Sequence, residues 1–308
     1  VSLGIGEALL TPEYWRKIDS LADKHVRLSE VDLKQINGAD CILDNPFVLP
    51  VTKEIIDAVP NLKYIGTLST SYGKVDTEHA AKKGVVVCNI PGFSTEAVAE
   101  FAIAAILEYI RDIEHSKQLA RADDFSDVPK FPVYEIKGKK FGVIGLGRIG
   151  TRIAELAHAF GADVYYWSRN RKKDAEEIGI KYTDIDKLLS ECDFISINLA
   201  FNKETEGFMD SGRISTIKPG ALFINLSPNE LIDLDALEKR LKKGDIVYIF
   251  DHTDELSQDI IIRLKNYKNC ILYPPLAFAT KEAKVVKQEI FVSNIENFLE
   301  GMPTNKVN

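Results

Sequence analysis

The sequence predicts an α/β protein built from two doubly wound, parallel-sheet domains of the Rossmann or flavodoxin type. Short β-branched runs alternate with helical patterns along most of the chain, which is typical of parallel sheets with crossover helices. The chain has 308 residues, enough for two domains of roughly 150 residues each. The alternation breaks between residues 87 and 141, which indicates a junction between the domains.

The strands are expected at short runs of β-branched and aromatic residues. These runs are 26–28, 41–43, 64–66, 85–87, 141–144, 164–167, 194–197, 222–224, 247–250 and 270–272. Gly4-Ile5-Gly6 is interpreted as the end of one more strand. Residues 95–120 are predicted to form one long helix, and residues 123–134 an irregular, proline-containing segment. The last helix is expected over 282–299, where it either returns to the first domain or caps the second sheet.

The composition limits the classes of partner. Its 39 Lys and Arg residues against 46 Asp and Glu give a formal charge of −7, which argues against nucleic-acid or anionic-membrane binding. Glu100 and Glu108 interrupt the longest apolar stretch, and the chain begins without a signal-peptide pattern. The cysteines lack the spacing that zinc requires; they are Cys41, Cys88, Cys192 and Cys270. We therefore expect a reduced cytoplasmic protein without a metal, nucleic-acid or membrane partner.

A glycine-rich turn predicts a dinucleotide site. The strand pattern at 140–144 runs directly into this turn, and apolar residues follow at helical spacing to residue 160. Gly145 allows the tight turn, Gly147 lets the backbone approach a pyrophosphate, and Gly150 lets the helix lie close to the strand. The N–H groups and the dipole at the helix start favour phosphate binding. The expected coenzyme-binding residues here are Gly145, Leu146, Gly147, Arg148, Ile149 and Gly150.

The next strand ends in a basic turn, which indicates NADP(H). A carboxylate that binds the ribose of NAD would be expected about 18 residues past Gly150. The chain has a hydroxyl and cations there instead, a combination that suits a 2′-phosphate. The expected contacts are Ser168, Arg169, Asn170 and Arg171. We therefore expect NADP(H) to be preferred and NAD(H) to be possible, while a solvated basic turn without a ligand is the alternative.

An ordered series of motifs resembles the D-isomer-specific 2-hydroxyacid dehydrogenase family over nearly the whole chain. The motifs are Asn89-Ile90-Pro91-Gly92, Val98-Ala99-Glu100, residues 136–150, Ala159-Phe160-Gly161, Lys203-Glu204-Thr205, Ile217-Lys218-Pro219-Gly220-Ala221 and Phe223-Ile224-Asn225. The resemblance implies that a substrate domain, residues 1–95 and 283–308, and a coenzyme domain, residues 96–282, close over an interdomain cleft. It also implies a homodimer formed through the coenzyme domain.

The same resemblance implies a catalytic set that this chain has lost. In the family an arginine binds the substrate carboxylate, a histidine transfers a proton, and a glutamate interacts with the histidine. The arginine position falls on Pro228 and the histidine position on Pro275. The glutamate position falls on Leu256, or on Glu255 if the loop is one residue shorter. Without a cation and an acid, the alkoxide that develops during carbonyl reduction loses two stabilising interactions.

Other side chains are candidates for the missing roles. His252 is the first choice for an acid/base because imidazoles exchange protons near neutral pH, and an outward-facing loop histidine is the alternative. Glu255 is its candidate partner, and Tyr273 could donate a proton or merely pack. A Ser/Thr-rich turn aligns with the family's substrate loop, although such a turn needs no ligand; it is Ser69, Thr70, Ser71 and Tyr72.

Further coenzyme contacts are implied by the resemblance alone. Asp251 aligns with an aspartate near the carboxamide of the nicotinamide. The remaining implied contacts are Leu199, Ala200, Thr205, Leu226 and Ser227.

The leading hypothesis is an NADPH-preferring oxidoreductase that transfers hydride to a carbonyl or keto-acid-like small molecule with an atypical catalytic set. A catalytically silent NADP(H)-binding sensor or scaffold is the alternative. A plain keto-acid reductase that has recruited other residues ranks third.

Overall fold

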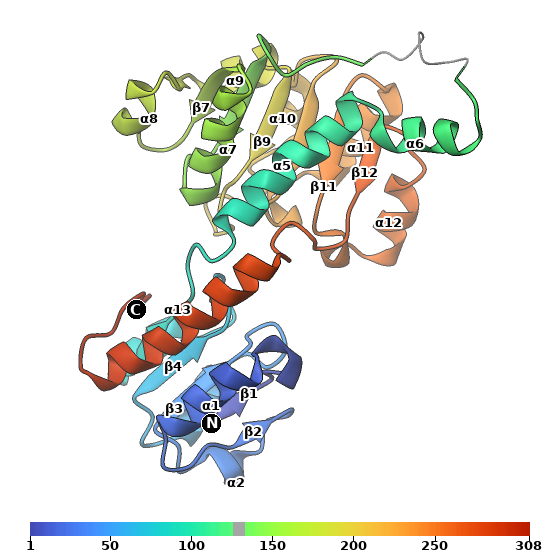
Figure 1. Ribbon diagram of the computed structural model, residues 1–308. Helices are drawn as coiled ribbons and strands as arrows, with labels where there is room; N and C mark the ends of the chain where they lie inside the picture. The colour runs from blue at the N-terminus through green and yellow to red at the C-terminus, as the bar shows by residue number, and fades with distance from the viewer. Residues whose placement is uncertain (126–132) are drawn as a thin grey trace. The chain divides into compact units, whose positions relative to one another are not determined.

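The computed structural model describes residues 1–125 and 133–308, and the chain divides into two compact units. Unit 1 comprises Val1–Ser94 with Thr280–Asn308, and unit 2 comprises Thr95–Ala279 (Figure 1). The predicted irregular segment at 123–134 lies mostly outside the described residues. Each unit has one sheet in which all strand pairs are parallel. The predicted fold class is therefore confirmed.

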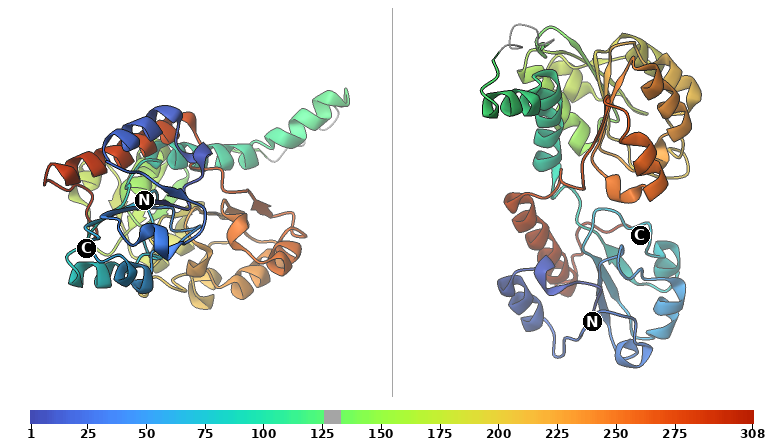
Figure 2. Two further views of the ribbon diagram at one scale, coloured as in Figure 1. Left: turned by 90° about the horizontal axis from the view of Figure 1, so that it is seen from below. Right: turned by 90° about the vertical axis from the view of Figure 1, so that its right-hand side faces the viewer.

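Unit 1 is a five-stranded sheet with helices on both faces (Figure 2). Its strands are β1 (Ser2–Leu3), β2 (Arg27–Leu28), β3 (Cys41–Asp44), β4 (Tyr64–Thr67) and β5 (Val86–Cys88). Its helices are α1 (Pro12–Ser20), α2 (Leu33–Ile36), α3 (Lys53–Ala58), α4 (Thr77–Lys82) and α13 (Lys281–Leu299), with a short 3₁₀ turn, η1 (Glu7–Leu9). The strand order β2-β1-β3-β4-β5 reverses direction between β1 and β3, as in flavodoxin-like sheets.

The last helix, α13, belongs to unit 1 rather than to the second sheet. Phe291, Val292 and Ile295 on this helix share a buried cluster with Trp15 and Ile18 of α1. Two buried amide side chains add specific polar contacts on the same helix. Gln288 Oε1 accepts the backbone N–H that precedes α1, and Asn294 Nδ2 donates to the carbonyl of Asn89. The helix is therefore a structural part of the first unit.

Unit 2 is a seven-stranded sheet in the order β12-β11-β10-β9-β6-β7-β8. Its strands are β6 (Lys140–Ile144), β7 (Asp163–Trp167), β8 (Lys181–Tyr182), β9 (Phe194–Ile197), β10 (Leu222–Asn225), β11 (Val247–Phe250) and β12 (Cys270–Leu272). Its helices are α5 (Thr95–Ile110), α6 (Ile113–Arg121), α7 (Arg148–Ala159), α8 (Lys173–Glu177), α9 (Ile185–Glu191), α10 (Ser211–Thr216), α11 (Leu234–Lys243) and α12 (Gln258–Leu264), with 3₁₀ turns η3 (Asn229–Leu231) and η4 (Thr253–Glu255). The order reverses between β6 and β9, which is where such sheets bind ligands at the carboxyl ends of their strands.

Two buried clusters cover the two faces of this second sheet. One cluster contains side chains from α5 and α7, and the other contains side chains from α9, α10, α11 and α12. The expected strands are all present, and β1 ends directly before Gly4 as predicted. The two-residue strand β8 had not been predicted. Among the described residues, no helix combines the length and apolarity needed to cross a bilayer.

The prediction of one long helix over 95–120 is wrong. The helix ends at Ile110, and a second helix, α6, begins at Ile113. Asp112 adopts a left-handed conformation, φ +48° and ψ +45°, which aspartate tolerates better than most residues. The carbonyl of Ile110 accepts the N–H of Tyr134 rather than continuing the helical ladder. A distant segment of the chain therefore takes the hydrogen bond that a continuous helix would need.

Unit 1 holds a buried carboxylate at the carboxyl end of β3. Asp44 is 0% exposed, and its Oδ1 accepts the hydroxyl of Thr67 at 2.8 Å. Its Oδ2 is buried without a hydrogen-bond partner. Burial raises the pKa of this carboxyl to about 7, against the opposing effect of the Thr67 hydrogen bond. The folded protein therefore keeps a proton on Asp44 at pH values where the unfolded chain has lost it.

We predict that Asp44 makes unit 1 less stable as the pH rises from about 4 to 7, because the unfolded state binds fewer protons in this range. Asp44→Asn removes this dependence. Its free energy of unfolding relative to the parent should rise by about 3 kcal/mol between pH 5 and pH 8. Urea unfolding followed by Trp15 fluorescence in a Trp167→Phe background reports on unit 1. The exposed Asp23→Asn is the control, and parallel pH profiles for the Asp44 and Asp23 variants would contradict the prediction.

Candidate active site

The glycine turn after β6 has the close packing that the sequence predicts. Gly145 has φ +90°, and a Cβ there would lie 2.7 Å from Leu199 Cδ2 and 2.8 Å from the carbonyl oxygen of Asn198. A Cβ on Gly150 would lie 2.0 Å from the carbonyl oxygen of Gly145. The Gly150 contact brings the start of α7 against the end of β6, and the Gly145 contacts bring the turn against the residues that follow β9. Both positions therefore require glycine for steric reasons.

The middle glycine has a different environment. Gly147 caps α7 with φ −84° and ψ −164°, and a Cβ there would meet nothing within 4 Å. The turn thus leaves open space directly beside a backbone segment at the start of a twelve-residue helix. The first N–H groups of such a helix have no partners within it. These features fit a pyrophosphate, and they lie at the point where the strand order reverses.

The basic turn after β7 is exposed and already contains ion pairs. Arg169 pairs with Glu204 at 2.9 Å, and both side chains are about 70% exposed. Arg171 pairs with Glu176 and lies over the ring of Tyr182. Sequence analysis did not predict the Arg169–Glu204 pair, because Glu204 follows β9 rather than β7.

Ser168 and Asn170 complete the basic turn. Ser168 is buried and donates its hydroxyl to the carbonyl of Asn170 at 2.6 Å. This hydrogen bond shapes the turn and leaves Asn170 exposed beside the two arginines. The turn is therefore ordered by its own contacts and presents cations to solvent.

The other implied coenzyme contacts lie at the ends of β9 and β10. Thr205 donates its hydroxyl to the carbonyl of Ala200 at 2.7 Å, and this contact closes the loop that begins at Leu199. Ser227 donates its hydroxyl to the carbonyl of Ile197, and Leu226 before it is half-buried. Both hydroxyls therefore hold neighbouring loops in place at the carboxyl ends of the strands of unit 2. We call this side of the sheet the reactive edge.

Asp251 connects the loops that follow β11 and β12. The side chain is 0% exposed, and its carboxylate accepts the backbone N–H groups of Leu276 and Ala277 at 3.0–3.2 Å. Burial raises the pKa of Asp251, whereas the amide hydrogen bonds and the nearby His252 lower it. The loop that it holds contains Pro275, the residue to which the sequence analysis assigns the family's histidine position. This contact fixes the shape of the edge at which the nicotinamide is expected.

His252 lies between two carboxylates at this edge. Its Nε2 is 3.8 Å from Oδ2 of Asp251, and its Nδ1 is 3.9 Å from Oε1 of Glu255. The imidazole lies nearly parallel to the ring of Phe278, and 26% of the side chain is exposed. The structure therefore places the ring of His252 near Glu255, its candidate partner from the sequence.

Glu255 also contacts the loop after β10. Its Oε2 accepts the backbone N–H of Asn229 at 3.1 Å. Asn229 directly follows Pro228, the residue to which the sequence analysis assigns the family's arginine position. Leu256, the other candidate for the glutamate position, is buried in the apolar core. Asn229 had not been predicted, since no motif linked the two loops.

Tyr273 faces away from this pair. Its hydroxyl donates to Oε2 of Glu108 on α5 at 2.5 Å, and its ring packs edge-on against Phe101. Burial and the Glu108 hydrogen bond raise the pKa of Tyr273 above its usual value. The Tyr273 hydroxyl is thus engaged in packing unit 2, and Glu108 is a partner that the sequence did not reveal.

The Ser/Thr-rich turn of unit 1 is ordered by its own hydrogen bonds. Ser69 accepts the N–H of Ser71, and Thr70 donates its hydroxyl to the carbonyl of Ile90 at 3.1 Å. Ser69 is buried, whereas Thr70, Ser71 and Tyr72 are exposed. The turn follows the carboxyl end of β4 and presents hydroxyl groups and backbone to solvent.

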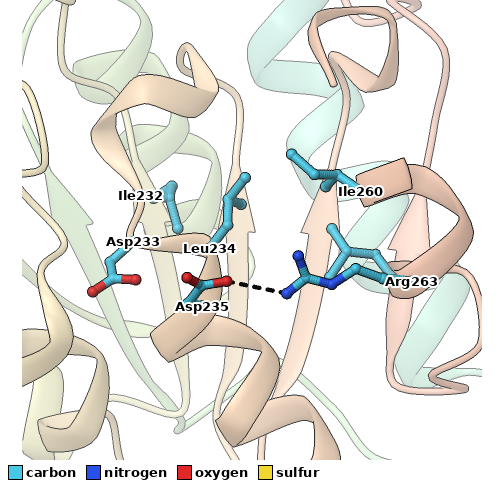
Figure 3. Close-up of a pocket in the computed structure, with 7 residues that line it drawn as sticks. Ile232, Asp233, Leu234, Asp235, Ile260 and Arg263 are labelled. Carbon is cyan, nitrogen blue, oxygen red and sulfur yellow. Dashed lines mark hydrogen bonds and ion pairs between the residues drawn. The ribbon is translucent and has the colours of Figure 1, made fainter. Parts of the chain in front are cut away.

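A separate pocket of about 250 Å³ lies between the start of α11 and the helix α12. Figure 3 shows Asp235 and Arg263 paired across it, 3.0 Å apart. Its lining includes Ile232, Leu234 and Ile260 and none of the residues expected to bind coenzyme or substrate. The pocket is therefore distinct from the glycine turn and from the His252–Glu255 pair.

Comparison with known proteins finds a matching family model and similar chains. The family model for D-isomer specific 2-hydroxyacid dehydrogenase, NAD binding domain, matches residues 103–277. The hydroxypyruvate reductase of Blautia hydrogenotrophica is 32% identical over 308 residues, which cover 96% of this chain and 94% of the relative.

Two solved structures with bound coenzymes are also similar. An acyclic imino acid reductase (Bsp5) in complex with NADPH and D-Arg has a TM-score of 0.85 at 29% identity, covering 97% of this chain and 96% of that one. The D-lactate dehydrogenase of Aquifex aeolicus, complexed with NAD and lactic acid, has a TM-score of 0.85 at 27% identity, covering 97% and 95%.

The fold, the glycine turn and these relatives define a nicotinamide-dependent oxidoreductase that acts on CH–OH or C=O groups. More specifically, the chain belongs to the D-isomer-specific 2-hydroxyacid dehydrogenase family.

Two glycine substitutions should separate folding from coenzyme binding. The methyl group of Gly147→Ala meets open space, so we expect a loss of less than about 1 kcal/mol in the free energy of unfolding. We expect NADPH binding to be at least about tenfold weaker, because the methyl group occupies the approach of the pyrophosphate. Gly150→Ala overlaps the Gly145 carbonyl and should cost about 1–3 kcal/mol. Urea unfolding and fluorescence titration with NADPH measure both effects. Unchanged NADPH affinity in Gly147→Ala would contradict the assigned site.

Proposed function

We propose that this chain is an NADPH-preferring reductase of small carbonyl or related compounds that works without the family's arginine and histidine. The observation that carries the coenzyme preference is the exposed basic turn after β7. Arg169 offers a guanidinium there, where a carboxylate would be expected for NAD. The imino acid reductase that was crystallised with NADPH supports the same preference. The free cysteines are consistent with a reduced cytoplasmic setting.

In the proposed mechanism the glycine turn binds the pyrophosphate through backbone N–H groups at the start of α7. The reduced nicotinamide supplies the hydride when it is bound. Asp251 holds the loops after β11 and β12 in register through its two amide hydrogen bonds. Unit 1 contributes substrate recognition through the exposed part of the turn at residues 69–72.

His252 is the proposed acid/base in carbonyl reduction. Its ring is partly exposed, so it can exchange protons with solvent, and Glu255 lies 3.9 Å from Nδ1. Tyr273 is the weaker candidate because its hydroxyl is donated to Glu108. The pair would thus replace the family's histidine and glutamate from a single loop.

We also propose a homodimer formed through unit 2. The junction of α5 and α6 carries a pocket of about 630 Å³ lined by Leu107, Ile113 and Ala120 among others, and Tyr109 and Ile113 are each 37% exposed. An apolar surface of this kind is typical of an interface. Light scattering should give twice the 34.4 kDa chain mass for the parent and the single mass for Ile113→Asp. A monomeric parent would exclude the dimer.

The coenzyme preference can be tested at Arg169. Arg169→Ala should weaken NADPH binding by roughly 10- to 100-fold, because a charge-assisted contact with the 2′-phosphate is lost. NADH binding should change by less than about threefold. Glu204→Gln, which removes the carboxylate paired with Arg169, should leave NADPH binding equal or tighter. If Arg169→Ala weakens the binding of NADPH and NADH equally, Arg169 does not recognise the 2′-phosphate.

The acid/base role can be tested at His252. His252→Gln should lower kcat for reduction of carbonyl compounds by about 100-fold or more, while the Kd for NADPH stays within about twofold. Stopped-flow reduction by bound NADPH measures the hydride step directly. The parent protein is first screened with a panel of aldehydes, ketones and keto acids. NADPH binding with no turnover in that screen would favour the silent sensor, and full activity of His252→Gln would remove the histidine from the mechanism.

A further inference from the structure

We propose that the preferred hydride acceptor is a cationic carbon–nitrogen double bond, an iminium, rather than a neutral carbonyl. This inference rests on the proposed function, because it uses the same coenzyme and the same edge of unit 2. It names the chemical class of the substrate. Three features carry it, namely the charge of the loops at this edge, the two prolines, and the position of Glu255.

The loops that follow β10, β11 and β12 are acidic. Residues 226–233, 251–257 and 273–279 are all described by the structure, and they contain no lysine or arginine. His252 is their one basic side chain. Their carboxylates are Glu230, Asp233, Asp251, Asp254 and Glu255. A substrate at this edge therefore meets negative charge from the protein.

The two prolines leave a carbonyl substrate without stabilisation. Pro228 and Pro275 have neither a charged group nor a backbone N–H to donate. Hydride transfer to a carbonyl creates an alkoxide, and nearby carboxylates oppose that charge. The proposed acid His252 would have to offset this cost alone. A conventional keto acid adds a second negative charge, so the loops fit it poorly.

An iminium has the opposite requirements. Its nitrogen already carries the proton, so no acid is needed during the hydride step. Its positive charge disappears in the reaction, so no anion has to be stabilised. A carboxylate beside it improves binding of the cation before reaction. The absence of the family's arginine and histidine therefore impairs carbonyl reduction but does not impair the reduction of an iminium.

Glu255 has the best position to bind such a cation. Its Oε2 is held by the N–H of Asn229, the neighbour of Pro228, at 3.1 Å. Its side chain is 31% exposed, and its Oε1 lies on the side of His252. Asp251 is fully enclosed and bound to two amides, and Asp233 accepts the N–H of Ala236 at the start of α11. The structure thus places an ordered carboxylate next to the position where the family has a cation.

The proposed step balances without a further reactant. A hydride carries both electrons from the reduced nicotinamide to the imine carbon, and a C–H bond forms there. The π pair of the C=N bond moves to nitrogen and cancels its positive charge. The products are a neutral amine and the oxidised coenzyme. The iminium itself forms beforehand from a carbonyl compound and an amine, with loss of water and uptake of one proton from solvent.

The first experiment compares each carbonyl compound with its own imine. The panel of aldehydes, ketones and keto acids is assayed with NADPH in the absence and presence of methylamine, which converts a fraction of each to the N-methyl imine. Preformed 1-pyrroline is assayed beside cyclopentanone. We expect kcat/KM to be at least tenfold higher for the imine of a pair. His252→Gln should reduce carbonyl turnover but leave imine turnover within about threefold.

The second experiment tests Glu255 by steady-state kinetics and also by a direct binding measurement. Glu255→Gln keeps an acceptor for the Asn229 N–H and removes the charge. We expect KM for the imine to rise roughly tenfold with little change in kcat, because the charge acts on binding, and Glu255→Asp to restore part of the effect. In calorimetry with coenzyme-bound protein, pyrrolidine, which is a cation at neutral pH, should bind more tightly than cyclopentanol. Glu255→Gln should remove that difference, whereas the exposed Glu177→Gln should not.

The outcomes separate this inference from the proposed function. NADPH binding with carbonyl reduction that methylamine never accelerates would overturn the iminium inference and leave the reductase intact. NADPH binding without reduction of any carbonyl or imine would overturn both. Faster imine reduction with the expected Glu255 effect on KM would support both. Faster imine reduction with no effect of Glu255→Gln on KM or on pyrrolidine binding would overturn the assignment of this carboxylate.

Discussion

The reactive edge of unit 2 depends on the buried carboxylate of Asp251. Asp251 directly follows β11, and the amides of Leu276 and Ala277 bind its carboxylate from the loop after β12. Removing a buried carboxylate's hydrogen-bond partners is costly, so the two loops are held together strongly. His252 and Pro275 take their positions from this connection. Asp251 therefore determines which side chains lie at this edge, although its own carboxylate oxygens already accept hydrogen bonds from backbone amides.

The fold was predictable where local constraints decide it. Gly150 is required by its contact with the Gly145 carbonyl, and Gly145 has a positive φ that favours glycine, so the strand, turn and helix could be recognised together. The end of α5 at Ile110 could not, because its carbonyl is bound by Tyr134 from another part of the chain. The two-residue strand β8 is too short to leave a periodic pattern. Local sterics are visible in a sequence, whereas long-range hydrogen bonds are not.

The same distinction applies to the candidate site. Counting along the motifs assigns the family's arginine and histidine positions to Pro228 and Pro275, and this assignment stays a prediction. The contact between Glu255 and Asn229 spans 26 residues, and that between Tyr273 and Glu108 spans 165. Neither pair has a fixed spacing that could reveal it. The sequence could therefore name the side chains near the reaction, but their pairing required the three-dimensional arrangement.

The position of α13 has a consequence for the order in which the chain is assembled. Unit 2 is one continuous segment, Thr95–Ala279, whereas unit 1 needs both the first 94 residues and Thr280–Asn308. The cluster around Trp15 and Ile18 lacks Phe291, Val292 and Ile295 until the final helix has been synthesised. Domains commonly fold as units during synthesis, starting from the N-terminus. Unit 1 is translated first but cannot complete its core until α13 has been synthesised. Unit 2 can complete its core earlier on the ribosome.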